Sequence, residues 1–310
     1  MSLEIPRILV VKLGALGDFI QALGPAQAIR RHHAEAAITL LTTAPFADLA
    51  RSCPYFDAVW IDEKPRLLDP AGLLRLRGRL LGGGFSRVYD LQTSDRSGFY
   101  FWLMGPGKRP EWSGIARGAS HPHRNPRRDF MHSLDRQAEQ LHDAGITPVP
   151  PPDLSWIGAD TARFGLAPGY VLLIPGGAAH RPEKRWPAAH YGALAARIAA
   201  SGFIPVILGS TAEAPLAAVI REHCPKAADL TGKTGLADLA GLARGARHSI
   251  GNDTGPMHVA VAAGSPATIL YSAASDPALT APRGPGVTVL RRDKLADLAV
   301  DEVAATFRIR

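Results

Sequence analysis

The stretch RILVVKLGALGDFI, residues 7–20, decides the fold of this 310-residue chain. Its first part, Arg7 to Gly14, is typical of a buried strand that ends in glycines, and Asp18 follows where a helix would begin. A strand that passes through a glycine turn into a helix is the opening unit of a doubly wound sheet. The stretch therefore predicts an α/β fold with functional residues at this turn.

Apolar segments and helical segments alternate along the rest of the chain. Residues 18–33 predict a helix interrupted near Gly24 and Pro25, and residues 187–202 and 236–246 predict two more helices. Further strands are expected at 36–43, 57–62, 87–92, 170–177, 203–210 and 265–273. Such alternation predicts parallel sheets of the doubly wound, Rossmann-like kind.

The alternation pauses between about Gly105 and Leu166. Residues 105–129, rich in Pro, Gly, Arg and His, predict a long loop; an amphipathic segment at 131–146 and the proline-rich linker TPVPPPDL at 147–154 follow. We therefore expect two domains, 1–155 and 156–310, whose carboxyl sheet edges face a central cleft. The last helix is expected to pack back on the first domain, and closure is expected about residues 148–165.

Composition narrows the class of protein. The chain is 46% hydrophobic and 20% charged, with a net charge of +7 that favours a negatively charged partner. Its two cysteines, Cys53 and Cys224, form no disulfide framework or zinc motif. No signal peptide or membrane-spanning stretch is evident. A cytoplasmic protein is expected.

In the first half, the candidate residues surround the first turn. Lys12 ends the strand, and Gly17 and Asp18 lead into the helix. Helix N-capping is an alternative role for Asp18. The pair Gly14 and Gly17 matches only part of a dinucleotide fingerprint, and the second strand lacks the acidic residue that NAD-binding folds place at its end. The sequence therefore disfavours, without excluding, an NAD-dependent oxidoreductase.

In the second half, two loops follow predicted strands. The loop PGGAAHRPEKRWP, residues 175–187, brings glycines and cations together, so its backbone N–H groups and Lys184 could bind phosphate oxygens. A solvated basic loop is the alternative. Glu213 follows Gly209 and could accept hydrogen bonds from a ribose, although a glutamate at a helix start also suits the helix dipole.

A third loop, GNDTGPMH at residues 251–258, joins an apolar run to a predicted helix. Asn-Asp-Thr-Gly is ordinary turn and capping chemistry, which is one interpretation. However, a helix start also offers free N–H groups and a positive dipole end to a pyrophosphate. All three loops lie at strand-to-helix turns, which meet at one edge of a parallel sheet, and this convergence favours a phosphate-bearing ligand.

These segments resemble glycosyltransferase family 9, the heptosyltransferases of bacterial lipopolysaccharide core synthesis. The resemblance rests on VKLGALGD (11–18), PGGAAHRPEKRWP (175–187) and LTGKTGLADLAGLARGARHSIGNDTGPMHVAVAAG (230–264). It implies the GT-B architecture of two Rossmann-like domains, with acceptor bound by the first and nucleotide sugar by the second. It also implies an inverting transfer that needs no metal or other cofactor, and no Asp-x-Asp motif occurs in the chain.

The resemblance assigns roles by position. Asp18 matches the catalytic base and Lys184 the lysine that contacts the donor phosphates; Glu213 would hold the ribose and Asp253 the donor sugar. The expected donor-binding residues are Lys12, Gly17, Gly176, His180, Lys184, Glu213, Asp253, Thr254, Gly255 and His258. The donor is expected to be ADP-heptose. A transferase of the same family with another nucleotide sugar or another acceptor is one alternative, and a non-catalytic nucleotide-sugar binding protein is a second.

The densest cationic region lies in the first half and predicts an acidic partner. Its expected acceptor-binding residues are Arg96, Lys108, Arg109 and Arg117, with Arg124, Arg127, Arg128, Trp102 and Trp112 nearby. A phosphorylated, lipid-linked acceptor and peripheral contact with the cytoplasmic face of the inner membrane are expected. A solvated loop is the alternative, and no nucleic-acid-binding motif is present.

Overall fold

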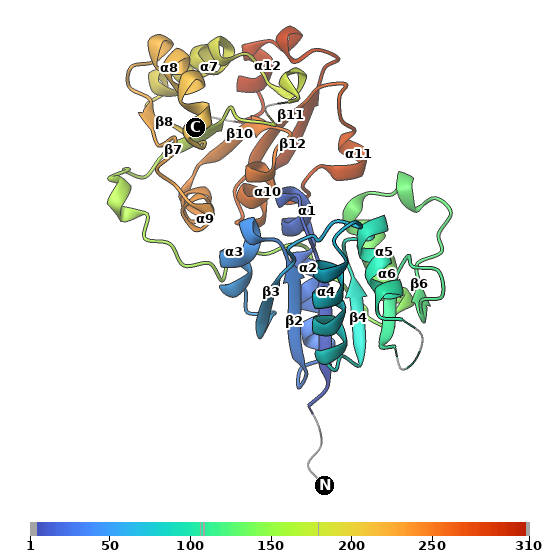
Figure 1. The fold of residues 1–310 in the computed structure, drawn as a ribbon. Coiled ribbons are helices and arrows are strands. Elements are labelled where there is room, and N and C mark those ends of the chain that lie inside the picture. The colour runs from blue at the N-terminus through green and yellow to red at the C-terminus, as the bar shows by residue number, and fades with distance from the viewer. Residues whose placement is uncertain (1–4, 106, 108, 179, 308–310) are drawn as a thin grey trace. The chain divides into compact units, whose positions relative to one another are not determined.

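The protein divides into two compact units, Met1–Pro152 and Asp153–Arg310. The structure, a computed structural model, describes residues 5–105, 107, 109–178 and 180–307. Each unit contains a six-stranded sheet in which all the paired strands are parallel (Figure 1). The division between the units falls inside the proline-rich stretch 147–154.

The first unit has the strand order β3-β2-β1-β4-β5-β6. Its strands are β1 (Arg7–Val11), β2 (Ala37–Thr42), β3 (Ala58–Ile61), β4 (Arg87–Asp90), β5 (Glu111–Gly114) and β6 (His121–Pro122). Its helices are α1 (Leu16–Gln21), α2 (Leu23–His32), α3 (Ala47–Arg51), α4 (Pro70–Gly82), α5 (Asp95–Leu103) and α6 (Ser133–Asp143).

Alternate residues of β1 face the two sides of the first sheet. Leu9 and Val11 belong to a buried cluster that includes Leu76 and Leu80 of α4 and Tyr100 of α5. Val10, on the other face, lines a small cavity with Phe19 of α1 and Ala26 of α2, and these two helices contact α6. The sheet is therefore a buried layer between helices, which explains its nearly continuous apolar strands.

The second unit has the order β12-β11-β10-β7-β8-β9. Its strands are β7 (Tyr170–Ile174), β8 (Ile204–Ile207), β9 (Ala228–Asp229), β10 (His248–Asn252), β11 (Ala267–Tyr271) and β12 (Val287–Arg291). Its helices are α7 (Ala188–Ala200), α8 (Ala214–His223), α9 (Leu236–Gly245), α10 (Gly255–Ala262), α11 (Pro277–Thr280) and α12 (Val300–Ala304). Helices α7 and α12 pack together, and α9 packs against α10.

The two sheets follow one plan. Numbered within its own unit, each sheet has the order 3-2-1-4-5-6 of the doubly wound nucleotide-binding fold, read from one side or the other. In both, the order in which successive strands join the sheet reverses between the first and fourth strands: β1 and β4 in one unit, β7 and β10 in the other. The predicted fold class is confirmed, and such reversals are where ligands bind in these sheets.

Local details differ from the sequence predictions at two places. The break between the first two helices comes at Ala22, and Gly24 and Pro25 lie inside the first turn of α2, where a proline costs no hydrogen bond. The predicted loop at 105–129 contains two short strands, β5 and β6, which extend the first sheet. Their few residues lie among prolines and glycines, so they carry no alternating pattern.

Candidate active site

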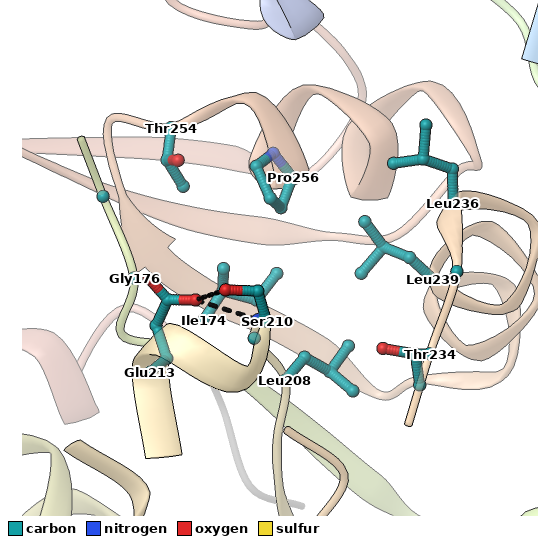
Figure 2. Close-up of a pocket in the computed structure, with 13 residues that line it drawn as sticks. Ile174, Gly176, Leu208, Ser210, Glu213, Thr234, Leu236, Leu239, Thr254 and Pro256 are labelled. Carbon is teal, nitrogen blue, oxygen red and sulfur yellow. Dashed lines mark hydrogen bonds between the residues drawn. The ribbon is translucent and has the colours of Figure 1, made fainter. Parts of the chain in front are cut away.

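A cavity of about 350 Å³ opens at the carboxyl edge of the second sheet (Figure 2). Its walls come from the loops after β7, β8, β9 and β10, as the topology requires. Thr254 and Pro256 lie on one side of it, and Ser210 and Glu213 lie on the other (Figure 2). A cavity of this volume at a topological switch point is the size and place of a nucleotide site.

Lys184 and Asp253 form an ion pair beside this edge. Lys184 Nζ donates to Asp253 Oδ2 at 2.6 Å, and both side chains are nearly buried. Burial alone would raise the pKa of Asp253, but hydrogen bonds from Lys184 and from Ser275 Oγ, at 2.7 Å, lower it below its ordinary value. The carboxylate is therefore charged at neutral pH and holds the ammonium group in place.

Asn252 ties two of the loops together. Its Nδ2 donates to the carbonyl oxygens of Pro175 and Gly176 at 2.8 and 3.1 Å, and its Oδ1 accepts from the Trp186 backbone N–H at 2.9 Å. It also accepts from Tyr191 Oη at 3.1 Å. The side chain is fully buried, so these bonds fix where the loop carrying Lys184 runs.

Glu213 is held by a reciprocal cap at the end of β8. Its Oε2 accepts from the backbone N–H and hydroxyl of Ser210 at 2.8 and 2.6 Å. A Cβ added to Gly176 would lie 3.1 Å from Glu213 Cγ, and one added to Gly209 would lie 2.8 Å from Glu213 Cβ. Both glycines therefore make room for this carboxylate at the cavity wall.

The start of α10 completes the donor-side residues. Thr254 takes the N-cap position, but its side chain makes no capping hydrogen bond, in contrast to the capping interpretation of this turn. Gly255 and Pro256 form the first turn, and His258 is 7% exposed within it. His180 is exposed in the loop before Lys184. Thr254 thus presents a hydroxyl and a helix start to the cavity.

The carboxyl edge of the first sheet carries the predicted base. Asp18 is partly exposed in the first turn of α1, and Gly17 precedes it. Gly14 has a φ of +129°, and a Cβ there would lie 2.8 Å from Phe46, so only glycine fits this turn. Lys12 is buried beside them, and its Nζ donates to the Leu91 carbonyl at 3.1 Å.

Burial and charge shape this edge. Burial lowers the pKa of Lys12, while the neighbouring carboxylates of Asp18 and Asp90 oppose that change. Burial raises the pKa of Asp90 to about 6. Hydrogen bonds that its Oδ1 accepts from the backbone N–H groups of Gln92 and Thr93 act in the opposite direction. Lys12 and Asp18 therefore lie close enough for their charges to interact.

The predicted acceptor residues are not gathered in one place. Arg96, at the start of α5 beyond the carboxyl end of β4, donates to Tyr100 Oη at 3.4 Å. Arg117 is exposed after β5. Arg109 precedes β5 at the opposite sheet edge, with its guanidinium 4.6 Å from the Phe101 ring centroid. That position speaks against the role predicted for Arg109. Lys108 lies outside the described residues.

Sequence reasoning missed three polar residues at these edges. Asn252 had a signal, since it is the first polar residue of the GNDTG turn, but a role in holding another loop depends on tertiary packing. Ser275 lies beyond β11 and meets Asp253 only in the fold. Asp90 ends an ordinary strand, and nothing in its neighbours marks it.

Within the described ranges, no group of three His, Cys, Asp or Glu side chains is arranged to hold a metal ion. None of the described helices combines the length and the apolar character that crossing a bilayer demands.

The chain has two units, and each has the strand order of a Rossmann-like sheet. This is the GT-B fold class. Comparison with known proteins is more specific. The chain belongs to glycosyltransferase family 9 (heptosyltransferase), whose family model matches residues 73–302, and it is therefore a glycosyltransferase. The matched range begins after Lys12 and Asp18, so it carries no information on those residues.

Relatives extend along most of the chain. The lipooligosaccharide heptosyltransferase 2 of Haemophilus ducreyi is 34% identical, over 92% of this chain and 88% of its own length. A family 9 glycosyltransferase structure from Veillonella parvula has a TM-score of 0.84 at 22% identity, covering 99% and 97% of the two chains. The ADP-heptose heptosyltransferase II structure of Escherichia coli has a TM-score of 0.80 at 22% identity, covering 97% of each. At such identity the structures establish the fold.

Proposed function

We propose that this enzyme transfers heptose from ADP-heptose to a sugar of the lipopolysaccharide core. Family membership supports heptosyl transfer, and the names of its relatives point to lipopolysaccharide acceptors and an ADP-heptose donor. Membership also removes the reason to consider an NAD-dependent oxidoreductase. A different nucleotide sugar within the same family remains the second candidate.

The observation that carries the proposal is a cavity lined by Glu213 and by Thr254 at the start of α10, next to the ion pair of Lys184 with Asp253, the residue before Thr254. Lys184 and the backbone N–H group of Gly255 at the start of α10 would bind the diphosphate; Pro256 has no N–H, and that of Met257 donates to the Thr254 carbonyl. Asp253 would accept hydrogen bonds from hydroxyl groups of the sugar, and Glu213 would accept them from hydroxyl groups of the ribose. Gly176, Thr254 and Gly255 would allow the phosphates to approach the backbone closely.

The chemistry needs a base and a stabilised leaving group. The acceptor hydroxyl oxygen would attack the anomeric carbon from the face opposite the diphosphate, so the configuration inverts. The bond from that carbon to the diphosphate breaks, and the hydroxyl proton passes to Asp18. Charge that develops on the departing diphosphate would be stabilised by Lys184 and by the α10 dipole, which are already in position.

Lys184 and the α10 dipole would stabilise the charge of the departing diphosphate, a task for which other sugar-nucleotide enzymes use a metal ion. We therefore expect full transfer activity after extensive dialysis against EDTA. Activity that disappears on dialysis and returns with a divalent cation would contradict this part of the mechanism.

The first unit would bind the acceptor through cations at its carboxyl edge. Arg128 supports this, since its Nε and Nη2 are buried without a hydrogen-bond partner in the described chain, while its Nη1 donates to Asp129 at 3.0 Å. Arg136 lies on α6, one turn before Gln140, whose Nε2 donates to the Asp90 carbonyl. A phosphate or carboxylate of the acceptor would satisfy these guanidinium groups. The enzyme would work at the cytoplasmic face of the inner membrane.

A donor screen tests the proposal. ADP-, UDP- and GDP-sugars would be compared by calorimetry, followed by a turnover assay that detects release of the nucleoside diphosphate. Binding and turnover restricted to ADP-heptose are expected. Tight binding without turnover on any core acceptor would favour a non-catalytic binding protein, and preference for UDP or GDP would favour the second candidate.

A further inference from the structure

Helix α4 has apolar residues on both its inner and its outer face. Gly72, Leu76 and Leu80, spaced four residues apart, are buried against the first sheet. The opposite face carries Leu74, which is 67% exposed, and Leu81 two turns later. Surface helices of soluble proteins normally turn polar residues outward, so this outer face departs from the usual pattern.

The outer apolar face continues into the preceding loop. Leu67 and Leu68, two and one residues before the Asp69 N-cap, are 75% and 95% exposed. Together with Leu74 and Leu81 they form what we call the docking face. Four exposed leucines in one loop and the helix that follows it, with Leu81 at 38% exposure, are more than the scattered apolar exposure of an ordinary surface and indicate an interaction site.

Arginines lie beside the docking face. Arg75 and Arg77 are exposed on its two sides, because a helix turns each residue by about 100° from its neighbour. Arg66 is exposed in the loop before Leu67. Helix α4 contains no acidic residue, whereas the loop before it carries the exposed Glu63 and the partly exposed Asp69. Leucines on a stripe bordered by arginines are the pattern of a helix that lies in the plane of a membrane interface.

We propose that the docking face, Leu67, Leu68, Leu74 and Leu81 with Arg66, Arg75 and Arg77 beside it, docks this enzyme on a bilayer that contains anionic lipid. The leucines enter the boundary between head groups and acyl chains, and the guanidinium groups pair with lipid phosphates. A protein partner would explain the leucines. However, the basic side chains of this loop and helix outnumber the exposed Glu63 and the Asp69 N-cap beside them, and a net basic border fits an anionic surface better.

The position of the docking face suits an acceptor held in the membrane. Residues 62–69 follow β3, so the loop carrying Leu67 and Leu68 starts at the same sheet edge as Lys12 and Asp18, which follow β1. Figure 1 shows α4 lying along one face of this sheet. This step rests on the proposed function, because it explains the membrane contact by a lipid-linked acceptor.

The test is co-sedimentation of the full-length enzyme with vesicles. Binding to phosphatidylglycerol-rich vesicles and much weaker binding to pure phosphatidylcholine vesicles are expected. The triple variant Leu67→Ser, Leu68→Ser, Leu74→Ser should bind at least about tenfold more weakly. Arg75→Glu with Arg77→Glu should remove the preference for anionic lipid. Because all five side chains are exposed, the variants should keep the fold, and their thermal unfolding should be unchanged.

Phe130→Ser is the matched control, since Phe130 is 81% exposed on the same unit but lies outside the docking face. Its vesicle binding should equal that of the wild type. Equal binding by the leucine triple variant, or no vesicle binding by the wild type, would overturn the proposal. So would a concentration-dependent oligomer that disappears in that variant, because a second copy would then cover the face.

Vesicle binding needs no donor, so the docking result is independent of the proposed reaction. If the docking proposal fails, transfer to a soluble core oligosaccharide still tests the proposed function. If the reaction fails, the sedimentation still tests the docking face.

Discussion

The two units share a strand order but differ in the partners of the charged side chains at the carboxyl edges of their sheets. In the second unit, Lys184 is paired with Asp253 at 2.6 Å beside a cavity of about 350 Å³. In the first unit, Lys12 donates to a backbone carbonyl, and Asp18 is partly exposed in the first turn of a short helix. The apolar cavity behind Lys12 measures only about 10 Å³.

This difference separates two tasks that one reaction needs. An edge that must hold a diphosphate gains from a cation fixed in advance, since ordering it costs nothing when the ligand arrives. An edge that supplies a base needs a carboxylate that can reach a hydroxyl. The comparison predicts that substitutions in the first unit act mainly on turnover and those in the second on donor binding.

The largest effect is expected for Asp18→Asn. Loss of the base should lower the rate of transfer by about 1,000-fold, while the affinity for ADP stays within about twofold of the wild type. Steady-state turnover with calorimetry on the same preparations measures both. Asp48→Asn, an exposed carboxylate on α3 of the same unit, is the control and should be fully active. Wild-type turnover of Asp18→Asn would remove Asp18 as the base.

Next in size is Lys184→Ala. Without the ammonium group, ADP should bind more weakly and transfer should fall by about 100-fold, because the leaving group loses a fixed positive charge. Lys226→Ala is the control, since Lys226 is exposed in the same unit and precedes β9, away from the carboxyl edge of the sheet. If Lys184→Ala bound ADP as tightly as the control, the phosphate contact would be disproved.

A smaller contrast compares two hydroxyls at the cavity. Thr254→Val should weaken ADP binding by about tenfold without loss of stability, because its side chain makes no cap. Ser210→Ala should instead lower the free energy of unfolding by about 1 kcal/mol, since the Ser210 hydroxyl accepts from the Ala212 N–H and donates to Glu213. Urea unfolding and calorimetry separate the two. The reverse pattern would mean that Thr254 is a structural cap.

The last prediction concerns the acid stability of the second unit. Burial lowers the pKa of His248 to about 4 from 6.5, because the folded state favours the neutral ring, whose Nε2 lies 2.8 Å from Thr268 Oγ1. Its stabilising contribution is therefore complete above pH 6.5 and is lost as the pH falls towards 4. From pH 7 to pH 5 the loss is about 2 kcal/mol.

The variant His248→Gln should show a smaller loss of unfolding free energy over that pH interval than the wild type. His223→Gln, an exposed histidine on α8, is the control and should follow the wild type. Identical pH profiles for wild type and His248→Gln would show that protonation of His248 does not contribute.

The fold could be predicted from sequence because strand and helix periods alternate plainly along the chain. The predictions that were wrong concern local secondary structure. The strands β5 and β6 have four and two residues, too few for a period to show. The sequence predicts an interruption near Pro25, but only packing determines whether a proline lies in the first turn of a helix or breaks its middle.

Candidate site residues could be predicted where the polar side chains that mark a site lie together in one loop, as in the segments that carry Lys184 and Asp253. Residues that act by holding another loop, such as Asn252 and Ser275, were missed because their partners are distant in sequence. Composition alone predicts Arg109 and Arg96 in one group, yet the two lie at opposite edges of the sheet, because a helix of a few residues, α5, spans the distance between those edges.

Hydrogen–deuterium exchange with saturating ADP tests the central claim most directly, which is that the donor occupies the carboxyl edge of the second sheet. Protection is predicted in the loops that carry Gly176 and Lys184, Ser210 and Glu213, and Thr254 and Gly255, with no change at residues 12–18. Protection confined to the first unit, or absent from all three loops in the presence of bound ADP, would contradict the account.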